Sequence, residues 1–176
     1  MADTIPSFNA TGDIERKYIA CAIDVSATST PEYLVVGYKM TSSYIETNPD
    51  VETGTDIRGM NFSSINKFEP SQTFEPHRLT KGEDGKLGEK LLHLFRYRKL
   101  AEFSMFKVMM IWGMLGQPGA YAADHYDACT LSPDSIGGES WAEMPFTVNF
   151  GGNITHGKAD KLIGLVAFTP DETPEV

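Results

Sequence analysis

The chain has 176 residues, of which 41% are apolar, and this length suits one globular domain spanning residues 1–176. No apolar run approaches about 20 residues, and the first residues lack the basic patch and apolar run of a signal peptide, so we expect a protein kept in a cytoplasm with no membrane partner. A net charge of −9 argues against a surface that grips nucleic acid, because such affinity comes from Lys and Arg displacing counterions from phosphates.

The first half of the chain predicts extended structure. Residues 17–25 form the first candidate strand, and residues 33–47, rich in Tyr, Val and Thr, form a longer one. A polar segment at 48–56 predicts a loop, and 57–68 returns as another extended piece. These segments indicate a long hairpin whose loop of roughly nine residues exceeds what a simple hairpin needs. The loop residues singled out are Asn48, Pro49, Asp50, Glu52, Gly54 and Asp56.

Residues 86–100 form the one convincing helix in the sequence, because apolar side chains recur there at helical spacing. The stripe consists of Leu87, Leu91, Leu92, Leu94 and Phe95. Basic residues gather on the rest of this segment, and the later ones lie where the helix dipole favours cations. In so acidic a chain, a solvated face or a salt-bridging partner surface is a better interpretation than nucleic-acid binding.

The most informative segment is 103–112, which is apolar on both faces if it is extended. A strand in a small antiparallel protein normally buries one face and exposes the other. One face here carries Phe103, Met105, Met109 and Ile111, and the other carries Phe106, Val108, Met110 and Trp112. We expect another subunit to cover the second face, since large exposed apolar surfaces usually mark association sites. Two alternatives stay open, a helix and a strand covered on both faces by its own chain.

The C-terminal third predicts strands separated by glycine-rich turns, at 121–131, 141–150, 154–157 and 162–169. The last of these again has two apolar faces, which strengthens the case for an oligomer. The fold class expected is therefore α+β and mainly β: an antiparallel β-sandwich or barrel-like sheet with one flanking α-helix and a long hairpin loop.

Candidate catalytic or metal-binding residues are sparse. The segment Asp-His-Tyr-Asp at 124–127 offers ligands, but neighbouring strand residues point to opposite faces, so at most half of them can meet one ion. Cys21 and Cys129 are too few for a zinc site, and Cys21 would be buried and inert in its strand. No glycine-rich phosphate loop is present. We expect no enzymatic activity, no catalytic residue, no metal and no cofactor.

The order of elements resembles the major tail tube proteins of tailed bacteriophages, which are related to the inner tubes of contractile tails, phage-derived bacteriocins and type VI secretion. The resemblance rests on Ile57-Arg58-Gly59 after the loop, the helix 87–98, Trp112-Gly113, and the run Phe-Thr-Val-Asn-Phe-Gly-Gly-Asn-Ile-Thr-His-Gly at 146–157. It spans nearly the whole chain as a pattern of elements without a unique motif. The chain is too short for the extra immunoglobulin-like domain that some members append.

The resemblance implies a subunit that assembles with copies of itself into hexameric rings, stacked as a hollow tube that conducts DNA without binding it specifically. Its other partners would be tail proteins such as tape measure, terminator and distal tail proteins, and its location the virion tail, assembled in the bacterial host cytoplasm. The ring interface is predicted at Phe103, Met105, Phe106, Val108, Met110, Trp112, Leu162, Val166 and Phe168. The 48–56 loop is predicted to order between stacked rings. Candidate acids of the channel wall are Asp24, Glu46, Asp127, Glu143 and Asp160.

The main alternative is a ligand-binding or enzymatic β-barrel that uses the same apolar faces as a pocket, with His125 or Asp127 as its polar anchor.

Overall fold

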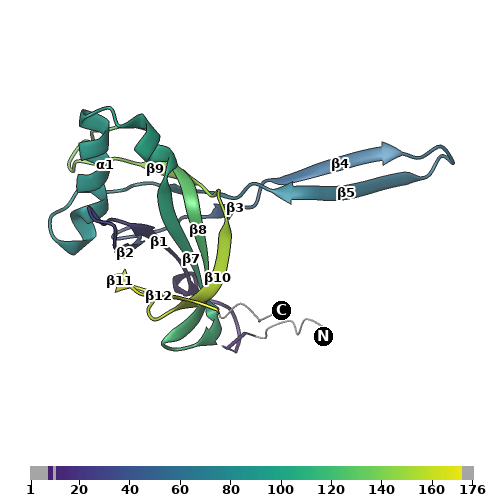
Figure 1. Ribbon diagram of the computed structural model, residues 1–176, viewed down its shortest axis with the longest axis horizontal. Coiled ribbons are helices and arrows are strands. Elements are labelled where there is room, and N and C mark those ends of the chain that lie inside the picture. The colour runs from purple at the N-terminus through teal and green to yellow at the C-terminus, as the bar shows by residue number, and fades with distance from the viewer. Residues whose placement is uncertain (1–7, 10, 172–176) are drawn as a thin grey trace.

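The computed structural model describes residues 8–9 and 11–171, which form ten strands of one antiparallel sheet, a separate two-stranded hairpin and one α-helix (Figure 1). The strands are β1 (Ile19–Asp24), β2 (Tyr33–Val36), β3 (Ile45–Glu46), β4 (Pro49–Thr55), β5 (Asn61–Phe68), β6 (Ser71–Phe74), β7 (Phe106–Gln117), β8 (Ala120–Pro133), β9 (Phe146–Asn149), β10 (Ile154–Ala159), β11 (Leu165–Val166) and β12 (Phe168–Pro170). The helix is α1 (Lys86–Arg96), and short 3₁₀ turns are η1 (Arg16–Tyr18), η2 (Glu83–Gly85) and η3 (Leu100–Ser104). The predicted fold class is confirmed.

The long hairpin β7–β8 is the centre of the sheet. Strand order runs β11-β2-β1-β7-β8-β9-β6-β3, and the outer edge of β8 is shared between β9 and β10, with β12 beyond β10. The sheet is strongly curled, because β11 and β12 are separated by only Ala167 yet pair with strands on opposite sides of β7–β8. The curl gives the sheet the form of a half-barrel.

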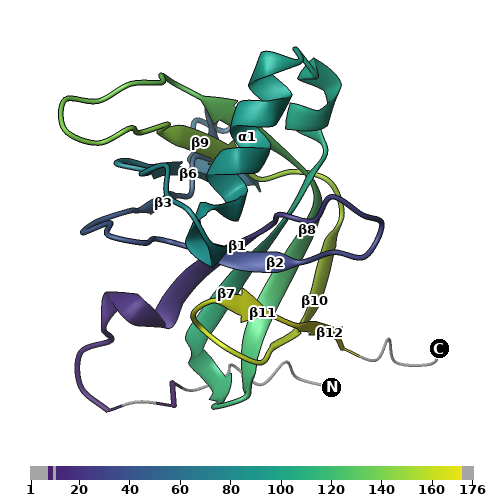
Figure 2. The ribbon, with the colours of Figure 1, turned by 90° about the vertical axis from the view of Figure 1, so that its left-hand side faces the viewer.

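Both faces of β7 are covered within the chain. Phe106 and Val108 pack with α1, β6 and β9 in one core, while Met109 and Ile111 pack with β10, β11 and neighbouring strands in another, and Met110 is buried as well. Figure 2 shows α1 and β9 on one side of β7–β8 and the C-terminal strands on the other. The expectation of a bare second face is therefore wrong, and the alternative of a strand covered by its own chain is right. The core residues from other elements include Cys21, Ile23, Leu34, Phe74, Leu131, Met144, Phe146, Val148, Ala159 and Val166.

The strand β7 also begins later and ends later than predicted. Phe103 lies in η3 and Met105 follows it, so neither belongs to the strand. At the other end, register shifts between Trp112 and Gly116 let the pairing continue to the turn at 118–119. Short glycine-containing irregularities of this kind bend a strand without ending it.

Two predictions for residues 33–68 are wrong in their boundaries. The strand expected at 33–47 splits, because β2 ends before Gly37 and Lys39, both of which have positive φ, and β3 is a separate two-residue strand. The loop expected at 48–56 is mostly strand β4, paired with β5 along its length. The long hairpin exists, but its turn lies at 56–60.

The helix α1 is shorter than the predicted 86–100 and buries part of the predicted stripe, because Leu92 is half-buried and Phe95 is exposed. Leu87, Leu91 and Leu94 enter the core. The chain leaves the helix at Tyr97, and Arg98 then adopts φ +54° in a left-handed turn. No helix in the described part of the chain is long and apolar enough to cross a membrane.

Candidate assembly surfaces

The hairpin β4–β5, which we call the arm, projects from the body as a two-stranded sheet of its own (Figure 1). Every residue of β5 is exposed, as is every residue of β4 except the half-buried Gly54. An isolated two-stranded hairpin is at best marginally stable in water. The arm therefore lacks, within the described chain, the packing that normally stabilises such a strand pair.

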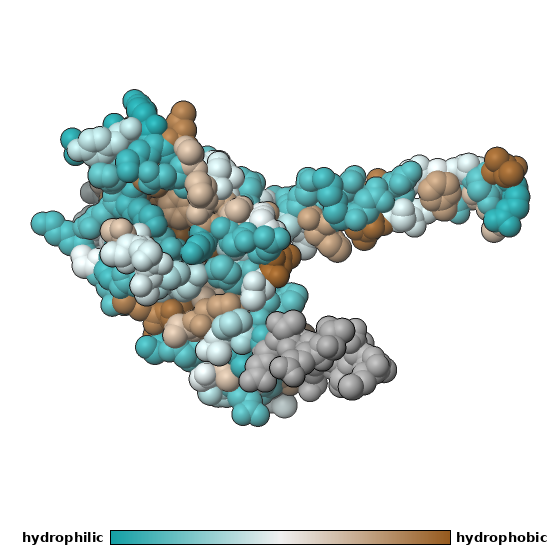
Figure 3. Space-filling view, viewed as in Figure 1, coloured by the Kyte–Doolittle hydropathy of each residue, from teal (hydrophilic) through white to brown (hydrophobic). Residues whose placement is uncertain are grey.

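The two faces of the arm differ in chemistry. Val51 pairs with Ile65 and Pro49 pairs with Phe68, so these four side chains share one face near the base, and that face carries no charge. Brown apolar surface is visible along the arm in Figure 3. All four residues are exposed.

The opposite face of the arm carries its charges. Asp50 pairs with Lys67, and Glu52 lies next to them on the same face. Further out, the Phe62 ring lies over Gly54, where an added Cβ would come within 2.5 Å of the ring. Gly54 is thus required by the close approach of an aromatic ring, and the arm is an amphipathic ribbon.

The tip of the arm is a turn held by Asp56. Its Oδ1 accepts the backbone N–H groups of Arg58 and Met60, each at 2.9 Å, and its Oδ2 accepts from the Arg58 guanidinium at 2.8 and 2.9 Å. The backbone hydrogen bond from Met60 and the pairing with Arg58 lower the pKa of this carboxyl. The turn presents two apolar side chains, Ile57 and Met60, both exposed.

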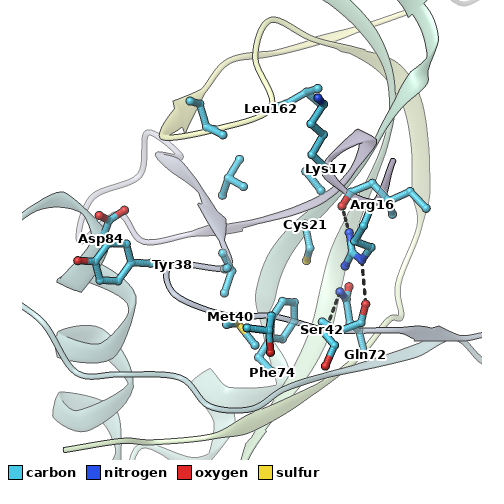
Figure 4. Close-up of a pocket in the computed structure, with 18 of the residues that line it drawn as sticks. Arg16, Lys17, Cys21, Tyr38, Met40, Ser42, Gln72, Phe74, Asp84 and Leu162 are labelled. Atoms are coloured by element: carbon cyan, nitrogen blue, oxygen red, sulfur yellow. Dashed lines mark hydrogen bonds between the residues drawn. The ribbon is translucent and has the colours of Figure 1, made fainter. Parts of the chain in front are cut away.

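A cavity of about 510 Å³ lies where β1 and β2 face β6, beside the start of β3. Cys21, Met40 and Phe74 form its apolar wall, and Arg16 and Gln72 bring polar groups to it (Figure 4). Full burial raises the pKa of the Cys21 thiol far above its ordinary value, which agrees with the inert cysteine expected from the sequence.

A second, more apolar groove of about 670 Å³ lies between the end of α1 and the end of β8. Its walls include Leu94, Phe103 and Leu131, and Arg98 stacks on Phe95 at 4.5 Å at its rim. This rim belongs to the basic segment predicted as a partner surface.

The predicted ring-interface residues divide by accessibility. Met105 is 69% exposed. Four are half-buried (Phe103, Trp112, Leu162, Phe168) and four are buried (Phe106, Val108, Met110, Val166). The buried four are occupied by packing within the chain, because a side chain already enclosed cannot also contact a neighbour. Contact between subunits at the other five residues, which remain accessible, stays a prediction.

Three of the candidate channel acids accept hydrogen bonds from N–H groups of the same chain. Asp24 accepts the N–H groups of Ser26 and Glu32, and Asp160 accepts that of Ala167. Asp127 accepts the backbone and side-chain N–H groups of Asn153, and these hydrogen bonds lower its pKa.

The other two candidate acids differ from these. Glu143 lies 3.9 Å from Arg78 Nε, and Glu46 is exposed on the edge strand β3. Their placement in a channel stays a prediction.

The segment 124–127 is used internally. Asp124 accepts from the Trp112 indole and pairs with His156, both at 2.7 Å. His125 meets the Tyr33 hydroxyl at 2.8 Å and stacks on Phe168, and burial lowers its pKa. The alternative function needs His125 or Asp127 as the anchor of a pocket, but both are already engaged with other parts of the chain. Among the described residues, no group of three or more His, Cys, Asp or Glu side chains is placed to hold a metal ion.

Sequence reasoning missed two features of these surfaces. Gln72 was not singled out, because nothing local distinguishes a Gln in a strand. The apolar face of the arm was missed although Val51, Thr53 and Thr55 alternate with polar or small residues, which is a strand signal.

No protein-family model matches the sequence, and a search of curated proteins finds no match. Among solved structures, the chain is similar to the tube-terminating cap of an anti-feeding prophage, with 14% sequence identity, a TM-score of 0.44, and alignment over 90% of this chain and 100% of that one. A TM-score below 0.5 is too low to establish a common fold. The function proposed below therefore rests on the residues of this chain.

Proposed function

We propose that the chain is a structural subunit that assembles with copies of itself into hexameric rings, stacked as the hollow tube of a phage-type tail that conducts DNA. The observation that carries the proposal is the arm. Its apolar face at Val51, Ile65 and Phe68 is exposed, and soluble proteins rarely leave such a surface uncovered when it is contiguous. The sequence resemblance to tail tube proteins supports the same function.

The body of the protein buries its two cores, on either side of β7, within its own chain. The arm differs from the body, because it is a sheet of only two strands and no other part of the described chain packs against it. A partner surface that covers the arm would therefore stabilise the arm without disturbing the body, as expected of a subunit that folds first and assembles afterwards.

Within this proposal the arm makes the contact between stacked rings, and accessible residues such as Met105 contribute to contacts within a ring. The rings at the two ends of the tube would meet tape-measure, terminator and distal tail proteins. The acidic surface, with its net charge of −9, would let a DNA duplex slide instead of sticking.

The test is removal of the arm. Replacing residues 50–67 by Asn-Gly joins the paired residues Pro49 and Phe68 through a two-residue turn. We expect wild-type protein to form tubes by negative-stain microscopy, and the armless variant to keep the melting temperature of the body but to stop at rings. Wild-type protein that remains a 19.4 kDa monomer at high concentration would contradict the proposal.

A further inference from the structure

The cavity between β1, β2 and β6 contains an unsatisfied buried amide. Gln72 is 2% exposed, and its Oε1 has no hydrogen-bond partner in the described part of the chain. A buried acceptor left unpaired costs about 1–3 kcal/mol. Native proteins usually supply a partner for such an atom, and a cavity of about 510 Å³ beside it leaves room for one.

The orientation of this amide is fixed by its neighbour. Ser43 Oγ donates its one hydrogen to the carbonyl of Thr73 at 2.8 Å, so towards Gln72 it can only accept. The Gln72 Nε2 group donates to it at 3.0 Å, which leaves Oε1 as the free atom. The missing partner must therefore be a hydrogen-bond donor.

The remainder of the cavity is prepared for an apolar side chain. Cys21, Met40 and Phe74 supply its wall, and Arg16 is held at one side by donating to the carbonyls of Ser43 and Ile19 (Figure 4). Asp84 also lines the cavity and is exposed. An occupant should combine an apolar group with an N–H donor, since Arg16 and Lys17 as well as Asp84 line the cavity and it favours neither sign of charge.

The tip of the arm has this combination. Ile57 and Met60 are exposed apolar side chains, and Arg58 has five N–H donors, of which Asp56 takes only those on Nε and Nη2. The Arg58 side chain is 77% exposed and can therefore donate to a second acceptor.

The tip of the arm cannot reach the cavity of its own copy. Ser43 and Gln72, which line the cavity, lie just before and just after the arm in the chain, whereas the tip lies seven paired residues away, about 23 Å at 3.3 Å per residue. Figure 1 shows the arm pointing away from the body. The tip that enters this cavity must come from a second copy.

We propose that this cavity is a socket for the arm tip of a second copy, with Ile57 against the apolar wall and Arg58 donating to Gln72 Oε1. Arm and socket are different surfaces, so the contact is heterologous, and heterologous contacts that do not close produce open stacks. The inference rests on the proposed function and specifies it, because it assigns the contact between rings to this pair of surfaces.

Two substitutions at exposed residues test the two sides of the contact, the tip and the socket, one at a time. Ile57→Asp places a charge on the tip, and Ser42→Trp fills the socket from its rim, where Ser42 is exposed. Neither disturbs a buried side chain, so both variants should keep the wild-type melting temperature. We expect each alone to form single rings and no tubes in negative-stain images.

Mixing the two variants, each prepared as rings, gives the decisive result. An Ile57→Asp ring keeps its socket and a Ser42→Trp ring keeps its arms, so one junction can form, and double rings are expected in place of tubes. Ser64→Asp, which lies opposite Glu52 on the charged face of the arm and away from the tip, is the matched control for an added charge and should leave at least half of the tubes.

Crosslinking gives a second measurement. Ile57→Cys combined with Ser42→Cys should form disulfides between copies on oxidation, and neither single variant should. Tubes from Ser42→Trp protein, or tubes of the double cysteine variant without crosslinks, would overturn the socket and leave the proposed function standing. Absence of any assembly in the wild type would overturn both.

Discussion

At the scale of single residues, β7 shows how one strand can be apolar on both faces without a partner subunit. Phe106 and Val108 meet the core under α1, and Met109 and Ile111 meet the core under the C-terminal strands. Val108 and Met110 are on the same face, so the two should respond alike to substitution. A charge at either position would be buried without a partner.

We therefore predict that Val108→Lys destabilises the isolated subunit by several kcal/mol, because an unpaired charge in a closed core carries most of its desolvation penalty. Thermal unfolding measures the effect. Met105→Lys is the matched control, since Met105 is exposed just before the strand and should change stability by less than about 0.5 kcal/mol. Equal melting temperatures for the two variants would contradict the burial of both faces.

A second prediction at the residue scale concerns His77. It is buried, packs edge-on against Phe146 at 5.0 Å, and donates from Nδ1 to the Met144 carbonyl at 3.3 Å, and burial lowers its pKa below the ordinary 6.5. Above pH 6.5 the His77 side chain is neutral in both the folded and the unfolded protein, and its contribution to the free energy of unfolding is complete. As pH falls through 6.5 the unfolded chain binds a proton first, so stability decreases by up to about 1.4 kcal/mol per pH unit until the folded form also binds one.

Urea titrations at a series of pH values measure this slope. His77→Leu should flatten the dependence between pH 7 and pH 5, whatever its effect on absolute stability. Part of the slope should remain, because burial also lowers the pKa of His125. An unchanged slope in the variant would show that His77 titrates as it does in the unfolded chain.

At the scale of elements, the arm should be the least protected ordered part of the free subunit. Its strand hydrogen bonds are exposed to water and no core lies beneath them. We predict that amide hydrogens of β4 and β5 exchange orders of magnitude faster than those of β7 in the free protein, and that assembly protects them. Hydrogen-exchange mass spectrometry with peptides covering 49–68 tests both parts, and equal protection before and after assembly would count against the arm as a contact.

How far the sequence predicts these elements depends on how local their causes are. The helix follows from one stripe of leucines, and its position was predicted within a few residues. The arm was misassigned as a loop because Pro49, Gly54 and the nearby acids are unfavourable in strands, whereas the pairing of Val51 with Ile65 and the Phe62 ring over Gly54 compensate for them.

The socket was beyond the reach of sequence reasoning for a different reason. Arg16, Ser43 and Gln72 come from three separate segments of the chain and meet only after the sheet has curled. The covering of β7 likewise depends on C-terminal residues such as Val166, which lie far from it in the chain. Periodicity reports which faces are apolar, but it does not report which distant segment covers them.

At the scale of the whole molecule, charge is unevenly distributed. The segment from α1 through η3 carries five basic and two acidic side chains, so the rest of the chain is more acidic than the net charge of −9 alone suggests. Copies of an acidic subunit repel one another over distances comparable to the Debye length, about 30 Å at 0.01 M salt and about 8 Å at 0.15 M. Short-range apolar contacts at the arm are not screened in this way.

We predict that ionic strength controls assembly through this repulsion. Raising salt from about 0.01 M to about 0.15 M should shift the protein from subunits and rings towards tubes, because screening removes long-range repulsion while the arm and its partner surface keep their contact. Sedimentation velocity across a salt series measures the distribution. The paired substitution Glu46→Gln with Glu52→Gln removes two exposed charges, one on β3 and one on the arm, and should move the transition to lower salt without changing the melting temperature. A transition that moves to higher salt would mean instead that these carboxylates attract a basic surface on the neighbouring copy, for which the Arg96 to Lys99 end of the helix would be the first candidate.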